Sequence, residues 1–175
     1  MTGQAAVHLV CGATGAGKTT YARRLAEAEG AVRFSIDEWM SALFWMDAPD
    51  PFTPAWAMER VERCAARIWN TAVEVCGRGV PCVLEIGLTT AAGRAHYAGL
   101  ASAAGLPVKL HLVQAPLDER WLRVERRNHA PDADQLPFKI TREMFDFVEA
   151  MWEPPTAEEL AAHDGVAVDT GRARV

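Results

Sequence analysis

The chain has 175 residues, half of them apolar, and a formal net charge of -5. A chain of this length can bury one sizeable core, so we expect a single domain that spans residues 1–175. The net negative charge creates no overall positive electrostatic potential, which argues against general attraction to a nucleic-acid backbone.

The cysteines, histidines and apolar runs narrow the class of protein further. The cysteines form no CxxC pair and lie in apolar runs, as buried reduced thiols do; they are Cys11, Cys64, Cys76 and Cys82. The five histidines show no spacing typical of zinc ligands. No apolar run approaches the length of a membrane span, and Met1 to Val10 lacks the features of a signal peptide. We therefore expect a cytoplasmic protein without a membrane partner.

Strand and helix patterns alternate along the chain. The strand candidates are residues 7–11, 32–36, 80–86 and 107–113 and the stretch GVAVDT near the end. Helical patterns lie between them at 18–29, 56–76 and 90–104. This alternation predicts a parallel sheet covered by helices on both faces. The proline-punctuated segments 45–54 and 128–139 are expected to be loops over that sheet.

The turn after the first strand carries the most specific motif of the sequence. It matches G-x-x-x-x-G-K-[ST], with the preceding strand and following helix that the motif requires. Glycines let successive backbone N–H groups point inward, and the new helix places its positive end at the same spot. The sequence therefore predicts a polyphosphate-binding loop. Its residues are Gly12, Ala13, Thr14, Gly15, Ala16, Gly17, Lys18, Thr19 and Thr20.

Lys18 and Thr19 are the residues that make this turn a nucleotide site. We expect Lys18 to bridge the β- and γ-phosphates of ATP, and the Thr19 hydroxyl to complete the coordination of a Mg²⁺ ion. An ordinary glycine turn would explain Gly12 but not the lysine–threonine pair. The loop alone leaves the reaction open, because motors, switches and small-molecule kinases share it.

Asp37 is the best candidate for a second functional group. It directly follows the second predicted strand, at the carboxyl edge where ligands of such sheets collect. A carboxylate there can accept the proton of an acceptor hydroxyl. The alternative is a carboxylate that the macrodipole favours at the start of a helix, with Ser35 or Asp37 as the N-cap. The residues alone leave both interpretations open.

Three stretches of the sequence, including the loop, resemble a known group of proteins. They are "GATGAGKTTYARRLAEAEGAVRFSIDEW", "VPCVLEIGLTTAAGRAHYAGLASAAGLPVKLHLVQAPLDERWLRVERRN" and "FVEAMWEPPTAEEL". Together they resemble the small P-loop kinases of the AAA-type ATP-binding kinase group, which includes gluconate kinases, chloramphenicol phosphotransferase, zeta toxins and polynucleotide kinases. The resemblance implies a three-layer α/β fold with a five-stranded parallel sheet in the order 2-3-1-4-5. It also implies a short lid at about 128–139 and a substrate-side helical segment at about 38–76.

The resemblance assigns roles on the nucleotide side. Arg123 and Arg127 match the R-x-x-x-R helix that leads into the lid, so Arg123 would stack on the adenine and Arg127 would reach the phosphates. Arg120 and Arg126 are expected to be solvated. Glu85 takes the position of an acidic residue that is commonly aspartate in the group. This longer side chain would contact the metal, directly or through a metal-bound water, or it would contact the acceptor instead.

The resemblance also assigns residues on the acceptor side. Asp37 matches the base that faces the acceptor, so the expected catalytic residues are Lys18, Asp37 and Arg127. Arg94 matches a position where the group often carries an arginine toward the acceptor, and a solvated helix arginine is the alternative. Trp39 and Trp45 lie near the presumed active edge and could wall a pocket for a flat acceptor.

The leading hypothesis is therefore a kinase that moves the γ-phosphoryl group of ATP to a hydroxyl of a small metabolite, antibiotic or nucleotide sugar. One alternative is a 5′-hydroxyl kinase that acts on nucleic-acid ends, and another is a nucleotide-binding module without phosphotransfer. The sequence does not choose between ATP and GTP, and it names neither the acceptor nor the oligomeric state.

Overall fold

A single parallel sheet forms the centre of the fold. The computed structural model describes residues 5–129 and 138–171. The sheet has the order β2-β3-β1-β4-β5, and every neighbouring pair of strands is parallel, as the resemblance implied. The strands are β1 (Val7–Cys11), β2 (Val32–Ser35), β3 (Cys82–Glu85), β4 (Val108–Gln114) and β5 (Val166–Asp169).

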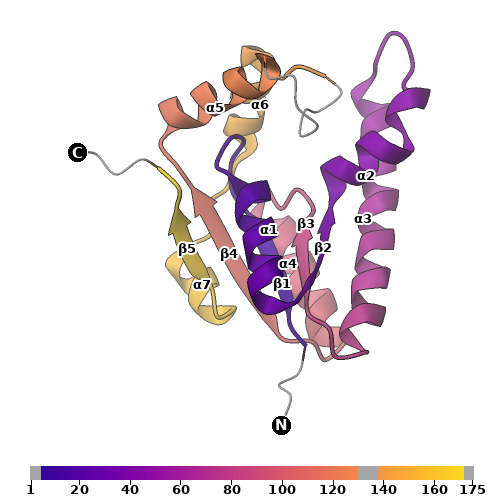
Figure 1. Cartoon of the computed structure of the whole chain (residues 1–175), viewed down its shortest axis with the longest axis vertical. Coiled ribbons are helices and arrows are strands. Elements are labelled where there is room, and N and C mark those ends of the chain that lie inside the picture. Colours follow the sequence, from indigo (N-terminus) through magenta and orange to yellow (C-terminus); the bar gives the residue numbers. More distant parts are fainter. Residues whose placement is uncertain (1–4, 130–137, 172–175) are drawn as a thin grey trace.

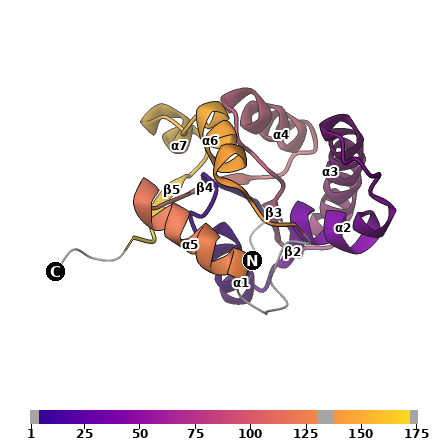
Figure 2. The same cartoon turned by 90° about the horizontal axis from the view of Figure 1, so that it is seen from above.

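Helices cover both faces of this sheet (Figure 1). They are α1 (Lys18–Glu29), α2 (Ile36–Leu43), α3 (Pro54–Cys76), α4 (Ala91–Ala103), α5 (Leu117–His129), α6 (Arg142–Met151) and α7 (Ala157–Ala162). A short 3₁₀ helix, η1 (Trp45–Asp47), follows α2. Seen from above, α4, α6 and α7 lie on one side of the sheet, and α1 and α5 lie on the other (Figure 2). None of the helices within the described ranges combines the length and apolar character that a membrane span needs.

The two faces of the sheet have different cores. The larger core packs one face of the strands against α3 and α4, with Leu9, Leu84 and Leu110 among its buried residues. The smaller core lies under α1, where Val10 and Val113 belong to the buried cluster. Because both faces are covered, the central strands are apolar on both sides rather than alternating. The four cysteines are buried and unpaired, as expected.

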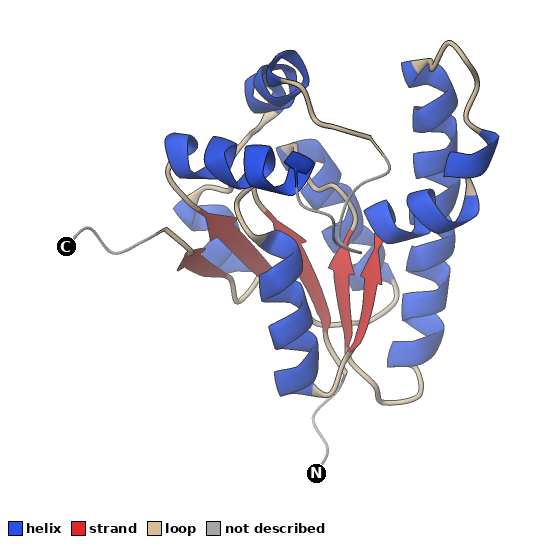
Figure 3. Ribbon diagram, turned by 45° about the horizontal axis from the view of Figure 1, so that its top comes forward, coloured by secondary structure: helices blue, strands red, loops and turns tan. Residues whose placement is uncertain are grey.

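Helix caps determine where several elements begin. The predicted second strand ran to Ile36, but β2 ends at Ser35 because the Ser35 hydroxyl accepts a hydrogen bond from the Glu38 backbone N–H at 3.4 Å and starts α2 there. The Thr90 hydroxyl caps α4 in the same way, accepting from the Gly93 N–H at 3.1 Å. Because the sheet is parallel, all strands end toward one edge. Helices α2 and α5 and the connecting loops gather at that edge (Figure 3).

Candidate active site

The loop between β1 and α1 is pressed against two neighbouring backbones. A Cβ atom on Gly12 would lie 2.2 Å from the Val113 carbonyl oxygen of β4, and one on Gly15 would lie 2.4 Å from the Arg120 carbonyl oxygen of α5. Gly15 also has a φ of 78°, which side chains rarely adopt. Glycine is therefore required at both positions, and the loop is fixed between β4 and α5.

Arg120 ties this loop to two helices. Its side chain was expected to be solvated, and this prediction is wrong, because Arg120 is only 6% exposed. Its guanidinium pairs with both carboxylate oxygens of Glu149 on α6, each at 2.7 Å, and donates to the Thr14 carbonyl oxygen at 3.3 Å. Such a fork-shaped pair restrains orientation as well as distance. Arg120 is therefore part of the scaffold that shapes the loop.

Lys18 begins α1 and folds back over the loop. Its Nζ donates hydrogen bonds to the carbonyl oxygens of Gly12, at 2.8 Å, and Ala13, at 3.0 Å. Burial lowers the pKa of Lys18, while the nearby Glu85 and Asp37 carboxylates oppose that shift. The ammonium group therefore lies beside the backbone amides that open α1. The positive charge and the N–H donors would together stabilise a bound polyphosphate.

Glu85 ends β3 beside the loop and is held by two donors. The Thr19 hydroxyl donates to Glu85 Oε1 at 2.5 Å, and the Arg33 guanidinium pairs with Oε2 at 2.9 Å. Burial raises the pKa of the Glu85 carboxyl, while the Thr19 hydrogen bond and the Arg33 charge oppose the rise. The carboxylate is thus buried but compensated, which accounts for an acidic residue at the end of an interior strand.

The Thr19 hydroxyl and the Glu85 carboxylate fit a magnesium ion. Both supply the hard oxygen donors that Mg²⁺ prefers. Across residues 5–129 and 138–171, no group of three or more histidine, cysteine, aspartate or glutamate side chains is placed to hold a metal. Phosphate oxygens and water would have to complete the coordination, as is usual for Mg²⁺ at nucleotide sites.

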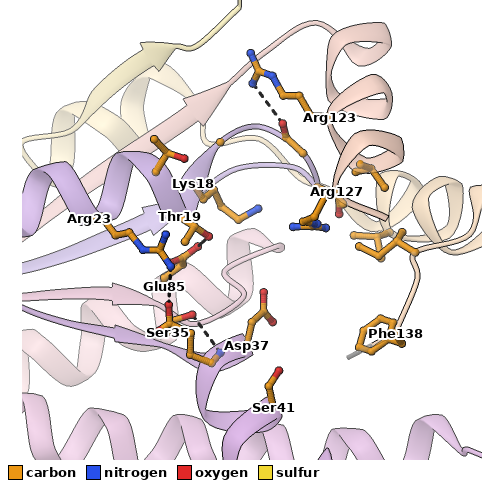
Figure 4. Close-up of a pocket in the computed structure, with 18 of the residues that line it drawn as sticks. Lys18, Thr19, Arg23, Ser35, Asp37, Ser41, Glu85, Arg123, Arg127 and Phe138 are labelled. Atoms are coloured by element: carbon orange, nitrogen blue, oxygen red, sulfur yellow. Dashed lines mark hydrogen bonds and ion pairs between the residues drawn. The ribbon is translucent and has the colours of Figure 1, made fainter. Parts of the chain in front are cut away.

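One cavity of about 950 Å³ joins the loop to the start of α2. Lys18, Thr19, Glu85, Asp37 and Arg127 all line it, and Figure 4 shows their side chains gathered around the same space. The predicted loop residues Thr14, Gly15, Gly17 and Thr20 line it too. The volume lies in the range of small-molecule sites.

Asp37 lies in the first turn of α2, exposed and directed into the cavity (Figure 4). The N-cap of α2 is Ser35, and Asp37 follows it in the first turn, where the positive end of the helix also favours a carboxylate. The Asp37 charge influences the pKa of both Lys18 and Arg127. Burial lowers the pKa of the Arg127 guanidinium, and Asp37 opposes this shift. Asp37 and the phosphate-side cations therefore share one electrostatic environment.

Arg123 lines the cavity and is held by Thr170, which directly follows β5. The Arg123 guanidinium donates to the Thr170 hydroxyl at 2.9 Å and to its carbonyl oxygen at 2.6 Å. The same hydroxyl donates to the Ala16 carbonyl oxygen of the loop at 2.7 Å. Thr170 was not predicted from the sequence, although its place at the carboxyl end of a strand was a signal.

Two residues predicted on the acceptor side lie elsewhere, and neither lines the cavity. Arg94 is 2% exposed and pairs with Glu159 at 2.5 Å, so it connects α4 to α7 instead of facing a ligand. Trp39 packs its ring edge-on against Phe34, with ring centroids 6.2 Å apart, and joins the larger core. Both assignments are corrected accordingly.

Further residues line the cavity that were not singled out from the sequence, although Ser41 and Ala42 lie in the predicted substrate-side segment and Phe138 lies in the predicted lid. Ser41, Ala42 and Glu38 belong to α2, and Arg23 lines the cavity from α1. An apolar group also lines the cavity: Phe138, Ile140, Met144 and Val148. The predicted lid falls mostly on residues 130–137, which lie outside the described residues. The amphipathic pattern of α6 was the available signal for Met144 and Val148.

Comparisons with known proteins identify the fold and the family of the chain. No curated protein matches the sequence. Among solved structures, a sugar kinase from Janibacter sp. HTCC2649 is 16% identical over 94% of this chain and 85% of its own, with a TM-score of 0.62. Kti12 from Chaetomium thermophilum, solved with ADP-AlF3, is 15% identical over 94% and 89%, with a TM-score of 0.71. The APS kinase of Mycobacterium tuberculosis, solved with AMPPNP and APS, is 16% identical over 97% and 91%, with a TM-score of 0.58.

At these identities the likeness to solved structures establishes a shared fold, which is that of P-loop NTPases. The family comparison reaches further, because a model described as an AAA domain matches residues 7–151. That match spans the phosphate loop, the strand that carries Glu85 and the helix that carries Arg127. The chain belongs to this AAA domain family.

Proposed function

We propose that the protein is an ATP-dependent kinase that transfers the γ-phosphoryl group to a hydroxyl of a small molecule. The observation that carries the proposal is that one cavity contains both a phosphate loop with Lys18 and, facing it from α2, the carboxylate of Asp37. A binding module would need only the loop. Asp37 is not the N-cap of α2, and its exposed side chain in the cavity suits a group that meets a second substrate.

The proposed reaction divides the work among the chain's own residues. The acceptor oxygen forms a bond to the γ-phosphorus while the bond to the β–γ bridging oxygen breaks, and the electron pair leaves with ADP. The acceptor proton passes to Asp37 and then to water. Lys18 and Arg127 offset the negative charge on the phosphoryl oxygens, which is the main catalytic contribution expected in phosphoryl transfer. Mg²⁺ held by Thr19 and Glu85 would supply further charge neutralisation and phosphate orientation.

The structural relatives support phosphotransfer as the general activity. A sugar kinase, an APS kinase and a gluconokinase share this fold, and the APS kinase structure contains a nucleotide analogue together with its acceptor. Their acceptors differ in chemistry, so the relatives support the donor side of the proposal more than the acceptor side.

Asp37→Asn tests the proposal. The protein would be incubated with γ-labelled ATP, Mg²⁺ and a panel of sugars, sugar acids, amino alcohols, nucleosides and 5′-hydroxyl oligonucleotides. Loss of the base should lower the transfer rate by about 10²–10⁴-fold, while calorimetry should show little change in ATP affinity. Asp47→Asn, which changes an exposed carboxylate in η1, is the matched control and should retain full activity.

The same experiment separates the alternatives. Full transfer activity in Asp37→Asn would refute the assigned role of that residue. Labelling of the oligonucleotides alone would favour a nucleic-acid kinase. ATP binding with no labelled product across the whole panel would favour a nucleotide-binding module.

A further inference from the structure

Arg33 of β2 lies at the centre of a chain of charged side chains beside the cavity. Its guanidinium donates to Glu85 Oε2 at 2.9 Å and also pairs with the Glu38 carboxylate on α2. Glu38 accepts a further hydrogen bond from Arg23 of α1 at 3.3 Å. The Arg33 side chain is only 14% exposed, and it is not among the described residues that line the cavity. One guanidinium therefore joins the end of β3 to the start of α2 from behind the site.

Strand register explains why Arg33 reaches Glu85. In the pairing of β2 with β3, Arg33 is aligned with Val83 and Ser35 with Glu85. Val83 belongs to the core under α1, and side chains two residues apart on a strand share a face. Arg33 and Glu85 therefore both lie on the face that α1 covers, where Thr19 meets Glu85 (Figure 4).

The two contacts of Glu85 assign a different partner to each of its oxygens. Oε1 accepts from the Thr19 hydroxyl, and Oε2 accepts from Arg33. Because the hydroxyl donates its hydrogen to Glu85, its lone pairs remain available to a cation. Rotation of the carboxylate would break this hydrogen bond, and the Arg33 pair opposes rotation by fixing direction as well as distance. Groups that orient metal ligands in this way control metal affinity.

The second contact of Arg33 extends the arrangement to the acceptor side. Glu38 follows Asp37 directly in the first turn of α2. The pair between Arg33 and Glu38 therefore anchors the turn that carries the candidate base to the candidate metal-side carboxylate. Neutralisation of the buried Glu85 charge is the alternative role for Arg33. The two roles predict opposite effects, because removing a cation beside a metal site would by charge alone strengthen the attraction of Mg²⁺.

We propose that Arg33 is a positioning residue for the binding of magnesium and nucleotide. It holds Glu85 in the orientation that meets Thr19, and it anchors the first turn of α2. The proposal rests on the nucleotide side of the proposed function and is independent of the identity of the acceptor. Because Arg33 acts through Glu85, its contribution depends on the presence of that carboxylate.

Calorimetry on the full chain tests the proposal through the magnesium gain, which we define as the ratio of the AMPPNP Kd in EDTA to that in Mg²⁺. Arg33→Lys keeps the positive charge but replaces the planar fork by a single ammonium group. We expect its magnesium gain to fall by about tenfold, while the metal-free affinity stays close to that of the wild type. Arg33→Gln should also lower the gain, although it removes a cation.

Arg63→Lys is the matched control. Arg63 pairs with Glu59 at 3.1 Å on α3, and both side chains are largely exposed, so this variant should keep the wild-type gain. A double-mutant cycle with Glu85→Gln then shows whether Arg33 acts through Glu85. Arg33→Lys should add little to the loss that Glu85→Gln causes alone.

Several results would overturn the proposal. A wild-type gain in Arg33→Lys, or an increased gain in Arg33→Gln, would reduce Arg33 to charge compensation. Additive losses in the cycle, or an equal loss of metal-free affinity in Arg33→Lys, would indicate a general structural role. A wild type that binds AMPPNP equally well with and without Mg²⁺ would refute the role of Arg33 and leave the nucleotide site intact. A wild type that binds no AMPPNP at millimolar concentration would refute the kinase proposal as well.

Discussion

The Thr19 hydroxyl donates a hydrogen bond to Glu85 across the junction between α1 and β3, with 2.5 Å between the two oxygens. Glu85 is also aligned with Ser35 in the pairing of β2 and β3, and Ser35 starts the helix that carries Asp37. The candidate metal ligands and the candidate base are therefore positioned by adjacent strand ends. A shift of one strand would move both sets of groups.

Glu85→Gln should separate magnesium binding from nucleotide binding. The amide keeps the shape of the side chain and can still accept from Thr19, but it removes the charge that attracts a cation. We expect the gain in ATP affinity on adding Mg²⁺ to fall by about tenfold or more, in the range seen when groups around a bound metal are altered. Affinity for metal-free ATP should stay equal or rise, because a negative charge near the phosphates is gone. Calorimetry with and without Mg²⁺ measures both values.

The control for that variant is Glu74→Gln, which alters an exposed carboxylate on α3. It should leave the effect of Mg²⁺ unchanged. A full magnesium effect in Glu85→Gln would contradict the assignment of Glu85 as a metal-side ligand.

Gly15→Ala should damage the phosphate loop. The added Cβ would lie 2.4 Å from the Arg120 carbonyl oxygen, and the φ of 78° is unfavourable for alanine. The loop must shift, so we expect ATP affinity to fall by about tenfold or more and the free energy of unfolding to fall by about 1–3 kcal/mol. Urea denaturation and calorimetry provide the two measurements.

Gly99→Ala is the matched change at an unconstrained glycine. Gly99 lies inside α4, and a Cβ there meets nothing within 4 Å. Alanine favours the helix, so this variant should be more stable by about 0.5–1 kcal/mol with unchanged ATP affinity. Similar losses in both variants would mean that the close approach of Gly15 to α5 is not what the loop requires.

Local chemistry made the phosphate loop predictable, whereas the strand order followed only from the resemblance to the kinase group. The motif from Gly12 to Thr19 predicts a phosphate-binding loop, because the glycines, the lysine and the flanking strand and helix must occur together. Asp37 was found because it follows a strand, and parallel strands end at one edge. These features depend on neighbours in sequence, so the sequence alone identified them.

The burial of Arg120 and Arg94 could not be predicted, because it depends on partner residues that are far away in the sequence. Arg120 pairs with Glu149, and Arg94 pairs with Glu159, each across a long stretch of chain. A charged residue on a helix looks the same in sequence whether it meets water or a buried carboxylate. One signal was present for Arg120, because it lies three residues before Arg123 and therefore on the same helical face.

Arg120→Met should destabilise both the fold and the loop. The change leaves the Glu149 carboxylate without its bidentate partner and the Thr14 carbonyl without a donor. Breaking a largely buried pair costs about 3–5 kcal/mol, so the urea midpoint should fall sharply and ATP affinity should weaken with it. Arg126→Met, on the exposed face of the same helix, should change stability by no more than about 0.5 kcal/mol. Comparable losses in the two variants would argue against Arg120 as the anchor of the loop.

A buried histidine pair under α1 should make the fold sensitive to acid. His8 Nδ1 lies 3.0 Å from His111 Nε2, and the Tyr21 hydroxyl lies 2.7 Å from His111 Nδ1. Burial lowers the pKa of both rings from 6.5, that of His111 to about 4. The folded state disfavours the charged ring, so protonation of the pair favours the unfolded chain. The free energy of unfolding is therefore undiminished above about pH 6.5 and falls by up to about 3 kcal/mol as the pH drops toward 4. Urea unfolding at pH 7 and pH 5 should show this loss in the wild type and in the control His96→Gln, which changes an exposed ring, but the loss should be much smaller in His111→Gln. An equal loss in all three proteins would mean that groups other than this pair cause the acid sensitivity.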